Sequence, residues 1–473
     1  MKVLIILPNT LFEDIYKDII SLDISKVFLV KDGFYINNKQ HKQKLVLMLS
    51  AMREYKLYLE SKDIKYKCVD SADDIKLNSE ADFYMYEPLD KKIRTKYKKI
   101  FKNVIYIKNR SIILSLSEVK EIKNSYKSTS SAGFRHNEFY KIMRKRLKIL
   151  TDEKGNPEFG KWSYDSLNRK PFTKEYKEMD IYVNNTTSVK KSIEEVYSDD
   201  SLSKAFGECK KLYYPTTFKS CKKQFNSFLA YKLERFGEFQ DAISSEVVFG
   251  EHSNISAVMN IGLLTPEYVI NKILKYYYSG NNAFRKKYIN SVEGFIRQII
   301  GWREYMRFVY EISGNALTND SYLKTIQDSK VVSIHSSWYS GTTGIPIFDK
   351  TIQKILQTGY AHHIERLMIL NNAMIMYGFS RKEIHKWFMA MFVDSYEWVM
   401  LGCVSMNHNS LSRDFKYMTR VYLAGDNYIK KMSNYRDNIS MDVFKHLFKT
   451  FIQQHKNILR RDYNLAGYIA RLK

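Results

Sequence analysis

Five short apolar segments, separated by longer stretches with helical periodicity, make up the first part of the chain. They are KVLIILP (2–8), KVFLVK (26–31), IKYKCVD (64–70), DFYMYEP (82–88) and KNVIYIK (102–108). The helix-like stretch HKQKLVLMLSAMREYKLYLESKD (41–63) lies between the second and the third segment. Strands that alternate with helices at this spacing predict a parallel sheet with helices on both faces. In such sheets a ligand binds outside the carboxyl ends of the strands.

The composition changes after this region. The segment NSYKSTSSAGFRHN (124–137) is rich in Ser and Thr, which is typical of a linker, and helical periodicity dominates after about residue 190. A chain of 473 residues exceeds what one hydrophobic core usually supports. We therefore expect an α/β domain over 1–123, an interdomain linker over 124–190 and a larger all-α domain over 191–473. The motifs GxGxxG and GxxxxGK[ST] do not occur, so neither a dinucleotide fingerprint nor a P-loop is predicted.

The chain is strongly basic. It has 76 Lys and Arg residues against 51 Asp and Glu residues, which gives a formal net charge of +25. An excess of this size on a folded chain favours a polyanionic partner. A bias toward Lys, Ile, Asn and Tyr in the coding sequence is the alternative explanation, and the two can hold together.

The cysteines and the apolar segments indicate the compartment. Cys68, Cys209, Cys221 and Cys403 lie far apart without a CxxC motif, which excludes a disulfide framework or a zinc ribbon. The first residues lack the features of a signal peptide, and no run of eighteen apolar residues occurs. We expect a soluble, cytoplasmic monomer without membrane contact.

Two adjacent histidines, His362 and His363, stand in the otherwise helical segment GYAHHIERLM (359–368). Neighbouring side chains on a helix point about 100° apart, so the two histidines have different surroundings. Chelation of a metal from one helix uses residues three or four positions apart, and we therefore expect no metal site here. Two hydrogen-bonded structural histidines are the alternative to a functional pair.

Several longer segments give a specific resemblance. They are HKQKLVLMLSAMREY, FYKIMRKRLKIL, GKWSYDSLNRKPF, ERFGEFQDAI, SAVMNIGLLTP, GFIRQIIGWREYMR, GYAHHIERLMIL and DSYEWVML. In this order the chain resembles the cryptochrome/photolyase superfamily, and most closely its bacterial iron–sulfur branch, which includes the prokaryotic (6-4) photolyases. The resemblance extends over about residues 1–435. It implies an α/β antenna domain, a linker and an all-α FAD-binding domain.

The resemblance also implies an FAD site. The expected cofactor residues are Ser253, Ser256, Asn260, Arg297, Gln298, Trp302, Arg303, Glu304 and Asp394. Ser and Asn in front of a helix hold phosphate in some proteins and are simple N-caps in others. Arg297 and Glu304 lie two turns apart on one face of an α-helix, where they form either a structural ion pair or a wall of the flavin cavity. Asp394 matches an acidic residue that sits over the isoalloxazine ring.

A lesion pocket and an electron path follow from the same resemblance. The expected pocket residues are His363 as the acid, His362, Tyr422 and Met406, with Lys42 and Leu45 approaching from the antenna domain. A histidine suits proton donation near neutral pH. Trp387 and Trp338 match the proximal and distal electron donors, although clustered tryptophans are ordinarily core packing. Phe388 stands where the family often has Tyr, and phenylalanine is a poor electron relay.

The chain departs from the iron–sulfur branch at several positions. Thr351, Arg436 and Ile439 occupy positions where the branch carries cluster cysteines, and Cys403 alone cannot hold a cluster, so we expect no iron–sulfur centre. Met400 stands where relatives carry Glu. The family's antenna chromophore is often a ribityl-lumazine, which would bind near the loop that contains Lys31 and Asp32.

The resemblance as a whole implies a blue-light-driven (6-4) photolyase. In that reaction, excited reduced FAD gives an electron to a flipped-out UV lesion. Extrusion of the lesion from the duplex costs little free energy, because damaged bases pair badly. A basic surface would hold UV-damaged DNA independently of sequence, with Arg366, Arg381, Lys382 and Lys386 as candidates. The alternatives are a prokaryotic cryptochrome-type FAD photoreceptor without repair activity and a flavin-free DNA-binding remnant. The sequence leaves open whether the lesion is a (6-4) photoproduct or a cyclobutane dimer.

Overall fold

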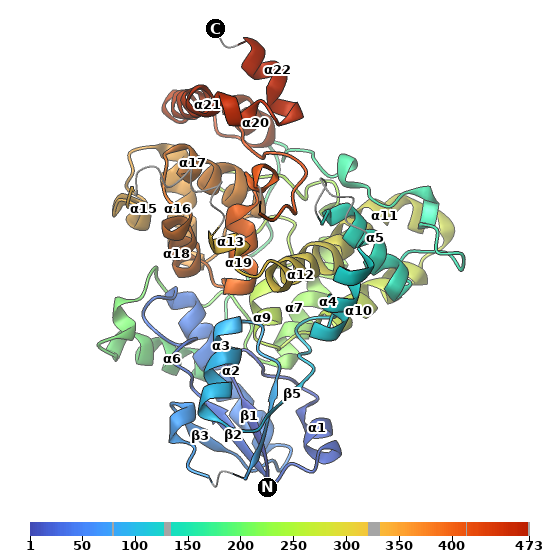
Figure 1. Ribbon diagram of the computed structural model, residues 1–473, viewed down its shortest axis with the longest axis vertical. Coiled ribbons are helices and arrows are strands. Elements are labelled where there is room, and N and C mark those ends of the chain that lie inside the picture. Colours follow the sequence, from blue (N-terminus) through green and yellow to red (C-terminus); the bar gives the residue numbers. More distant parts are fainter. Residues whose placement is uncertain (78–79, 127–133, 320–331, 413, 472–473) are drawn as a thin grey trace.

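A five-stranded parallel sheet forms the N-terminal end of the computed structural model, and helices α21 and α22 lie at the opposite end (Figure 1). The structure describes residues 1–77, 80–126, 134–319, 332–412 and 414–471. The strands are β1 (Lys2–Ile6), β2 (Lys26–Val30), β3 (Lys67–Val69), β4 (Asp82–Tyr86) and β5 (Val104–Ile107). All five predicted strand segments are thereby confirmed.

The sheet has the order β3-β2-β1-β4-β5. The central strand β1 pairs in parallel with β2 on one side and with β4 on the other. Its residues from Val3 to Ile6 are at most 1% exposed, because helices cover both faces of a parallel sheet. This double burial explains why the first strand is a continuous apolar run and not an alternating one.

Four helices complete the α/β part: α1 (Ile15–Ser21), α2 (Lys42–Glu60), α3 (Lys91–Ile100) and α4 (Leu116–Ser125). His41 starts α2, since its ring nitrogen accepts a hydrogen bond from the Gln43 amide at 3.0 Å. Ser115 and Glu118 form a capping box at the start of α4. The helix α6 (Thr187–Ser198), at the expected end of the linker, packs against α2.

The rest of the described chain is mainly helical, which confirms the predicted fold class. Besides α6 its helices are α5 (His136–Leu147), α7 (Phe218–Tyr231), α8 (Leu233–Phe236), α9 (Ser256–Asn260), α10 (Pro266–Ser279), α11 (Asn282–Ile296), α12 (Glu304–Ile312), α13 (Ala316–Asn319), α15 (Ser337–Ser340), α16 (Pro346–Thr358), α17 (Asn372–Met376), α18 (Arg381–Met391), α19 (Glu397–Ser405), α20 (Asp426–Met432), α21 (Asn438–Leu459) and α22 (Tyr463–Arg471). Two π-helical stretches, η5 (Arg297–Arg303) and η6 (Glu365–Asn371), interrupt this pattern. Such π-turns often occur at functional sites.

The expected linker is partly built into the helical domain. Its helix α5 packs against η5, and the Tyr140 hydroxyl donates a hydrogen bond to the Glu293 carboxylate at 2.8 Å. The expected boundary at residue 123 lies inside α4. Residues 127–133, which carry the Ser-rich core of the predicted linker, lie outside the described residues.

Buried charged groups on α12 dock the helical domain onto the carboxyl ends of the strands. Arg307 has no exposed surface; it contacts Glu87 at 2.8 Å and donates a hydrogen bond to the Leu89 carbonyl at 2.7 Å. The Glu304 carboxylate accepts hydrogen bonds from the amides of Ile113 and Leu114 at 2.9 and 3.0 Å. These partners lie in the loops after β4 and β5, so α12 packs against the edge of the sheet at which ligands usually bind.

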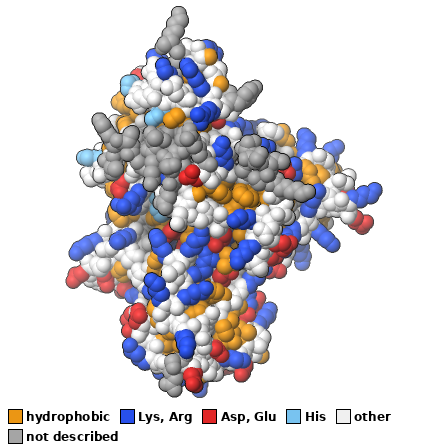
Figure 2. Space-filling model, viewed as in Figure 1, with side chains coloured by type: hydrophobic (Ala, Val, Ile, Leu, Met, Phe, Trp, Pro, Cys, Tyr) orange, Lys and Arg blue, Asp and Glu red, His pale blue; other side chains and the backbone are white. Residues whose placement is uncertain are grey.

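The surface reflects the basic composition. Lys and Arg side chains are spread over the whole visible face, from the sheet domain to the helical end, and are not confined to one patch (Figure 2). Among the described residues, no helix combines the length and the apolar character needed to cross a bilayer.

The buried Arg307 network should be far more important for stability than a surface ion pair. Replacement of Arg307 by Ala leaves Glu87 buried with a weaker contact to Arg94 at 3.4 Å. We expect Arg307→Ala to lower the free energy of unfolding by about 3 kcal/mol, which chemical denaturation would measure. The control is Arg146→Ala, which removes a partly exposed contact to Glu118 and should cost about 1 kcal/mol or less. Equal losses in both variants would contradict this prediction.

Candidate functional site

The centre of the site is an ion pair between Asp394 and Arg366. The Arg366 guanidinium donates to both Asp394 carboxylate oxygens at 2.8 and 3.3 Å, and the Ser256 hydroxyl donates to the same carboxylate at 2.7 Å. Burial opposes ionisation, but Arg366 and Ser256 hold the pKa of the Asp394 carboxyl below its ordinary value. The structure thus fixes a charged carboxylate between α9, η6 and the loop before α19.

Asn260 connects this centre to the α/β domain. Its amide donates to the Asp394 carbonyl at 3.0 Å, and its side-chain oxygen accepts from Arg303 at 2.5 Å. Arg303 also donates to the Ser111 carbonyl at 2.9 Å and lies over the Trp398 ring at 4.9 Å. Burial lowers the pKa of Arg303 to about 10, which still leaves it charged at neutral pH. Three predicted cofactor residues, Ser256, Asn260 and Asp394, therefore lie together, and the predicted Ser253 is half-buried just before α9.

Arg297 and Trp302 face a second set of partners. Arg297 contacts the carboxylates of Glu293 at 3.2 Å and Asp165 at 3.1 Å. The Trp302 ring stacks on His136, with ring centroids 3.8 Å apart. His136 was not predicted, because it lies far from its partner in the sequence and the two rings meet only in the fold.

Gln298 and Glu304 turn to other neighbours. The Gln298 amide donates to the Gly294 carbonyl at 2.8 Å, and Glu304 binds the backbone of Ile113 and Leu114. The expectation that Arg297 and Glu304 share one face assumed an unbroken α-helix. The π-helical stretch Arg297–Arg303 between them changes the number of residues per turn, so the two side chains reach different partners.

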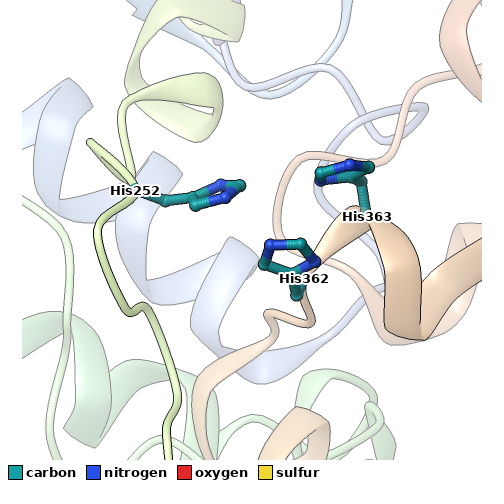
Figure 3. A group of neighbouring side chains, drawn as sticks. All are labelled: His252, His362 and His363. Atoms are coloured by element: carbon teal, nitrogen blue, oxygen red, sulfur yellow. The ribbon is translucent and has the colours of Figure 1, made fainter. Parts of the chain in front are cut away.

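The structure adds a third histidine to the predicted pair. His252 lies beside His362 and His363, and one ring nitrogen from each falls within 4.8 Å of the other two (Figure 3). The Nε2 atoms of His252 and His362 both donate to the Gln240 carbonyl, at 3.0 and 2.8 Å, while Nδ1 of His362 accepts from the Ile364 amide at 3.0 Å. Both nitrogens of His362 are thus engaged, and in this state it has no lone pair to give a cation.

Burial keeps two of the three rings neutral. It lowers the pKa of His252 to about 3, with further help from His363, and it lowers the pKa of His362 well below its usual value. His363 differs, since its side chain is 38% exposed and its Nε2 lies 3.1 Å from the Asp241 carboxylate. Of the three rings it is therefore the one that is accessible and paired with a carboxylate.

The predicted lesion contacts of Leu45 and Lys42 need correction. Leu45 is fully buried in the core, so it has no surface that could touch a nucleotide. Lys42 is 8% exposed, and its ammonium donates to the carbonyls of Ala205 at 2.5 Å and Gly207 at 3.3 Å. In this structure both residues of α2 are part of the packing and not of an open pocket wall.

Met406 and Tyr422 are linked through Asn407, which follows Met406 in the chain. Met406 is 7% exposed, and the backbone carbonyl of the next residue, Asn407, accepts a hydrogen bond from the Tyr422 amide at 2.7 Å. The Asn407 side chain in turn donates to the Tyr422 carbonyl at 2.8 Å, so the Tyr422 backbone is held beside the end of α19. Arg420 lies over the Tyr422 ring at 4.8 Å. The lesion contacts of Met406 and Tyr422 stay predictions.

The two predicted electron donors are in direct contact. The Trp387 indole is completely buried, and its N–H donates to the Trp338 carbonyl at 2.9 Å. Trp338 is 5% exposed, and Phe388 is 1% exposed. The structure therefore joins Trp387 and Trp338 within one apolar core.

The positions that correspond to cluster cysteines have their own contacts. The Thr351 hydroxyl donates to the Ile347 carbonyl at 2.7 Å, Arg436 donates to the Ser433 carbonyl at 2.8 Å, and Ile439 is 57% exposed. Of the four cysteines, Cys68 is exposed, Cys403 is half-buried, and Cys209 and Cys221 are buried.

Two of the predicted phosphate contacts are wrong for this structure. The Arg366 side chain is 13% exposed and paired with Asp394, and Arg381 is 7% exposed and donates to the Leu317 carbonyl at 3.2 Å, so both guanidinium groups are engaged within the protein. Lys382 and Lys386 are exposed, and Lys386 contacts Glu383 at 2.6 Å.

Known proteins match most of the chain. Residues 4–214 match the family described as deoxyribodipyrimidine photo-lyase-related protein, and residues 295–429 match the FAD binding domain of DNA photolyase. A (6-4) photolyase of Agrobacterium fabrum is 27% identical over 454 residues, which cover 90% of this chain and 86% of that protein.

Solved structures share the fold at low sequence identity. A bacterial class III photolyase from Agrobacterium tumefaciens superposes with a TM-score of 0.58 at 14% identity and covers 99% of this chain and 98% of its own. The cryptochrome of Synechocystis sp. PCC6803 gives a TM-score of 0.57 at 13% identity, with 97% of this chain and 91% of its own covered. These two structures show that the fold is shared. The two domain matches and the (6-4) photolyase relative show that the chain belongs to the cryptochrome/photolyase superfamily, in its prokaryotic branch.

Proposed function

We propose that this protein is an FAD-dependent, blue-light-driven DNA lyase that repairs (6-4) photoproducts. The observation that carries the proposal is the histidine cluster, in which His363 is accessible and paired with Asp241 while His252 and His362 are held neutral. One relative with this activity matches over most of the chain. UV-damaged DNA would be the partner of a monomeric protein, bound independently of sequence through the basic surface.

The residues around η5 and α9 fit a flavin. The buried atoms Arg297 Nη2, His136 Nε2 and Asn254 Oδ1 have no hydrogen-bond partner among the described residues. Buried polar atoms without partners are rare in folded proteins. The Arg297 donor and the Asn254 acceptor therefore favour a ligand that carries both acceptor oxygens and hydroxyl groups, such as the phosphate and ribityl groups of FAD. When bound and reduced, FAD supplies the electron for lesion cleavage after excitation by light. The fixed negative charge of Asp394 would tune the flavin's protonation and potential.

The protein's own part in the chemistry is proton transfer by His363. The Asp241 carboxylate holds the ring through Nε2 at 3.1 Å. His252 and His362 both donate to the Gln240 carbonyl, so neither competes as an acid near neutral pH. We assign His363 as the proton donor to the flipped-out base, with Asp241 as the residue that positions it.

We also propose an antenna chromophore at the carboxyl ends of the strands. Five polar atoms there or facing them are buried without a hydrogen-bond partner among the described residues: Asn9 Oδ1, Tyr35 OH, Asp90 Oδ2, Ser111 Oγ and Tyr396 OH. The first four residues follow β1, β2, β4 and β5, respectively, and Tyr396 precedes α19. A polar heterocycle with a ribityl chain, as in a ribityl-lumazine, would pair with such atoms. Lys31 and Asp32 are engaged elsewhere, with Glu195 at 2.7 Å and Lys96 at 2.9 Å, respectively.

The absence of an iron–sulfur cluster is also part of this proposal. A cluster normally requires four thiolates in one place. In the described chain the cysteines come from β3, the loop before α7, α7 itself and α19, and Thr351 and Arg436 are bound to neighbouring backbone carbonyls. Packing of α21 against α16 and α17 would replace the cluster as the support for the C-terminal helices.

The repair reaction tests the role of His363. Under blue light, the FAD-loaded protein should restore thymines in an oligonucleotide with one (6-4) photoproduct, and His363→Ala should lower the rate about 100-fold or more because the acid is lost. The flavin absorption should not change. The exposed His446, on α21, provides the control variant His446→Ala, which should repair normally.

Two results would count against the repair proposal. Full repair by His363→Ala would remove the acid role. Flavin bleaching without any repair by the unmodified protein would instead indicate the cryptochrome-type photoreceptor.

The content of small chromophores tests the antenna site. Protein purified in the dark should release a second chromophore besides FAD, and Asp90→Leu should lower its molar ratio to protein several-fold because a buried acceptor is lost. The exposed Asp70, after β3, gives the control Asp70→Leu with unchanged content. An Asp90→Leu protein with undiminished chromophore would contradict this site.

A further inference from the structure

A row of aromatic residues, joined by ring contacts and by one hydrogen bond to a backbone carbonyl, leads from the polar centre toward the surface. The Arg366 guanidinium lies over the Phe392 ring at 4.1 Å, and Phe392 contacts Trp387 with ring centroids 5.9 Å apart. Trp387 donates its indole N–H to the Trp338 carbonyl at 2.9 Å. The row therefore starts at the partner of Asp394 and reaches Trp338 without leaving the protein interior.

Trp338 is a poor end for such a row, because it is only 5% exposed. An oxidised indole that cannot release its proton to water is short-lived, since the electron returns along the path by which it left. The oxidised radical lives longer when the last donor is exposed to solvent and can release its proton.

The rings around Trp338 offer one suitable donor. Among the described residues, its ring neighbours are Phe348 at 5.0 Å, Phe379 at 5.6 Å and Tyr377 at 5.8 Å. Phenylalanine is hard to oxidise, whereas a phenol can give up an electron together with its hydroxyl proton. Tyr377, at the end of α17, is 36% exposed and meets Trp338 edge to face, at an interplanar angle of 80°. Tyr339 follows Trp338 in sequence, but its ring stacks on Phe206.

We propose that Tyr377 is the terminal electron donor of a Trp387–Trp338–Tyr377 chain that reduces the flavin. This inference rests on the proposed function, because it requires bound FAD as the light-driven oxidant. With FAD bound as the light-driven oxidant, Trp387 would give it one electron. Trp338 would then refill Trp387, and Tyr377 would refill Trp338, so that one electron in total leaves Tyr377. Each tryptophan returns to its starting state, and the Tyr377 phenol loses one electron to the chain and one proton to water. A thiol reductant in solution then restores the phenol by returning one electron and one proton.

The test compares three conservative variants of the FAD-loaded protein. Tyr377→Phe keeps the ring that packs on Trp338, Tyr339→Phe is the matched control, and Trp387→Phe interrupts the chain at its start. The measurements are the rate at which blue light with a thiol bleaches the oxidised flavin, and the radical trapped after illumination, identified by electron paramagnetic resonance with ring-deuterated tyrosine.

The expected result is a tyrosyl radical in the unmodified protein and in Tyr339→Phe, and its loss in Tyr377→Phe together with several-fold slower bleaching. A Tyr377→Phe protein with the unmodified rate and the same tyrosyl signal would overturn this inference while the proposed function stands. A Trp387→Phe protein with the unmodified rate would overturn the whole chain. A purified protein that cannot take up flavin would overturn the proposed function and this inference together.

Discussion

The docking of one long helical segment onto the end of the parallel sheet is the constraint on which the structure depends. From Arg303 to Arg307 this segment brings charged side chains into a buried interface, where the backbone of residues 111–114 and Glu87 satisfy them. Breaking such a network leaves unpaired charges in the interior, which lowers the stability of the fold. The interface therefore fixes the position of the helical domain on the strand ends. It also fixes the positions of the side chains that make contacts across the interface.

The functional groups lie along this docked segment. Arg303 binds Asn260, Asn260 binds the Asp394 backbone, and Asp394 pairs with Arg366, whose Nε donates to the Ala361 carbonyl directly before the histidine pair. A chain of hydrogen bonds thus connects the sheet edge, the candidate flavin centre and the histidine cluster. Groups held by such a network are preorganised, which is what positioning a cofactor beside an extruded base demands.

The sequence predicted the strands and the division into α/β and helical parts because both depend on local apolar patterns. Asp394, Ser256 and Asn260 were predicted as flavin contacts, and the structure brings these three residues together. The sequence missed His252, Gln240 and Asp241, since residues 240–241 and 362–363 meet only in the fold and their contacts span 122 positions. The expected lesion contact of Leu45 does not agree with its complete burial, because a helical pattern alone does not tell which α2 residues become buried. The π-turn after Arg297 likewise has no periodic signature in the sequence.

The most direct test of the account is a crystal structure of the protein with FAD and a duplex that contains one (6-4) photoproduct. The account predicts the isoalloxazine ring beside the Asp394 carboxylate, and the extruded lesion within hydrogen-bonding distance of His363. A flavin bound elsewhere, or a lesion whose nearest histidine is not His363, would contradict it.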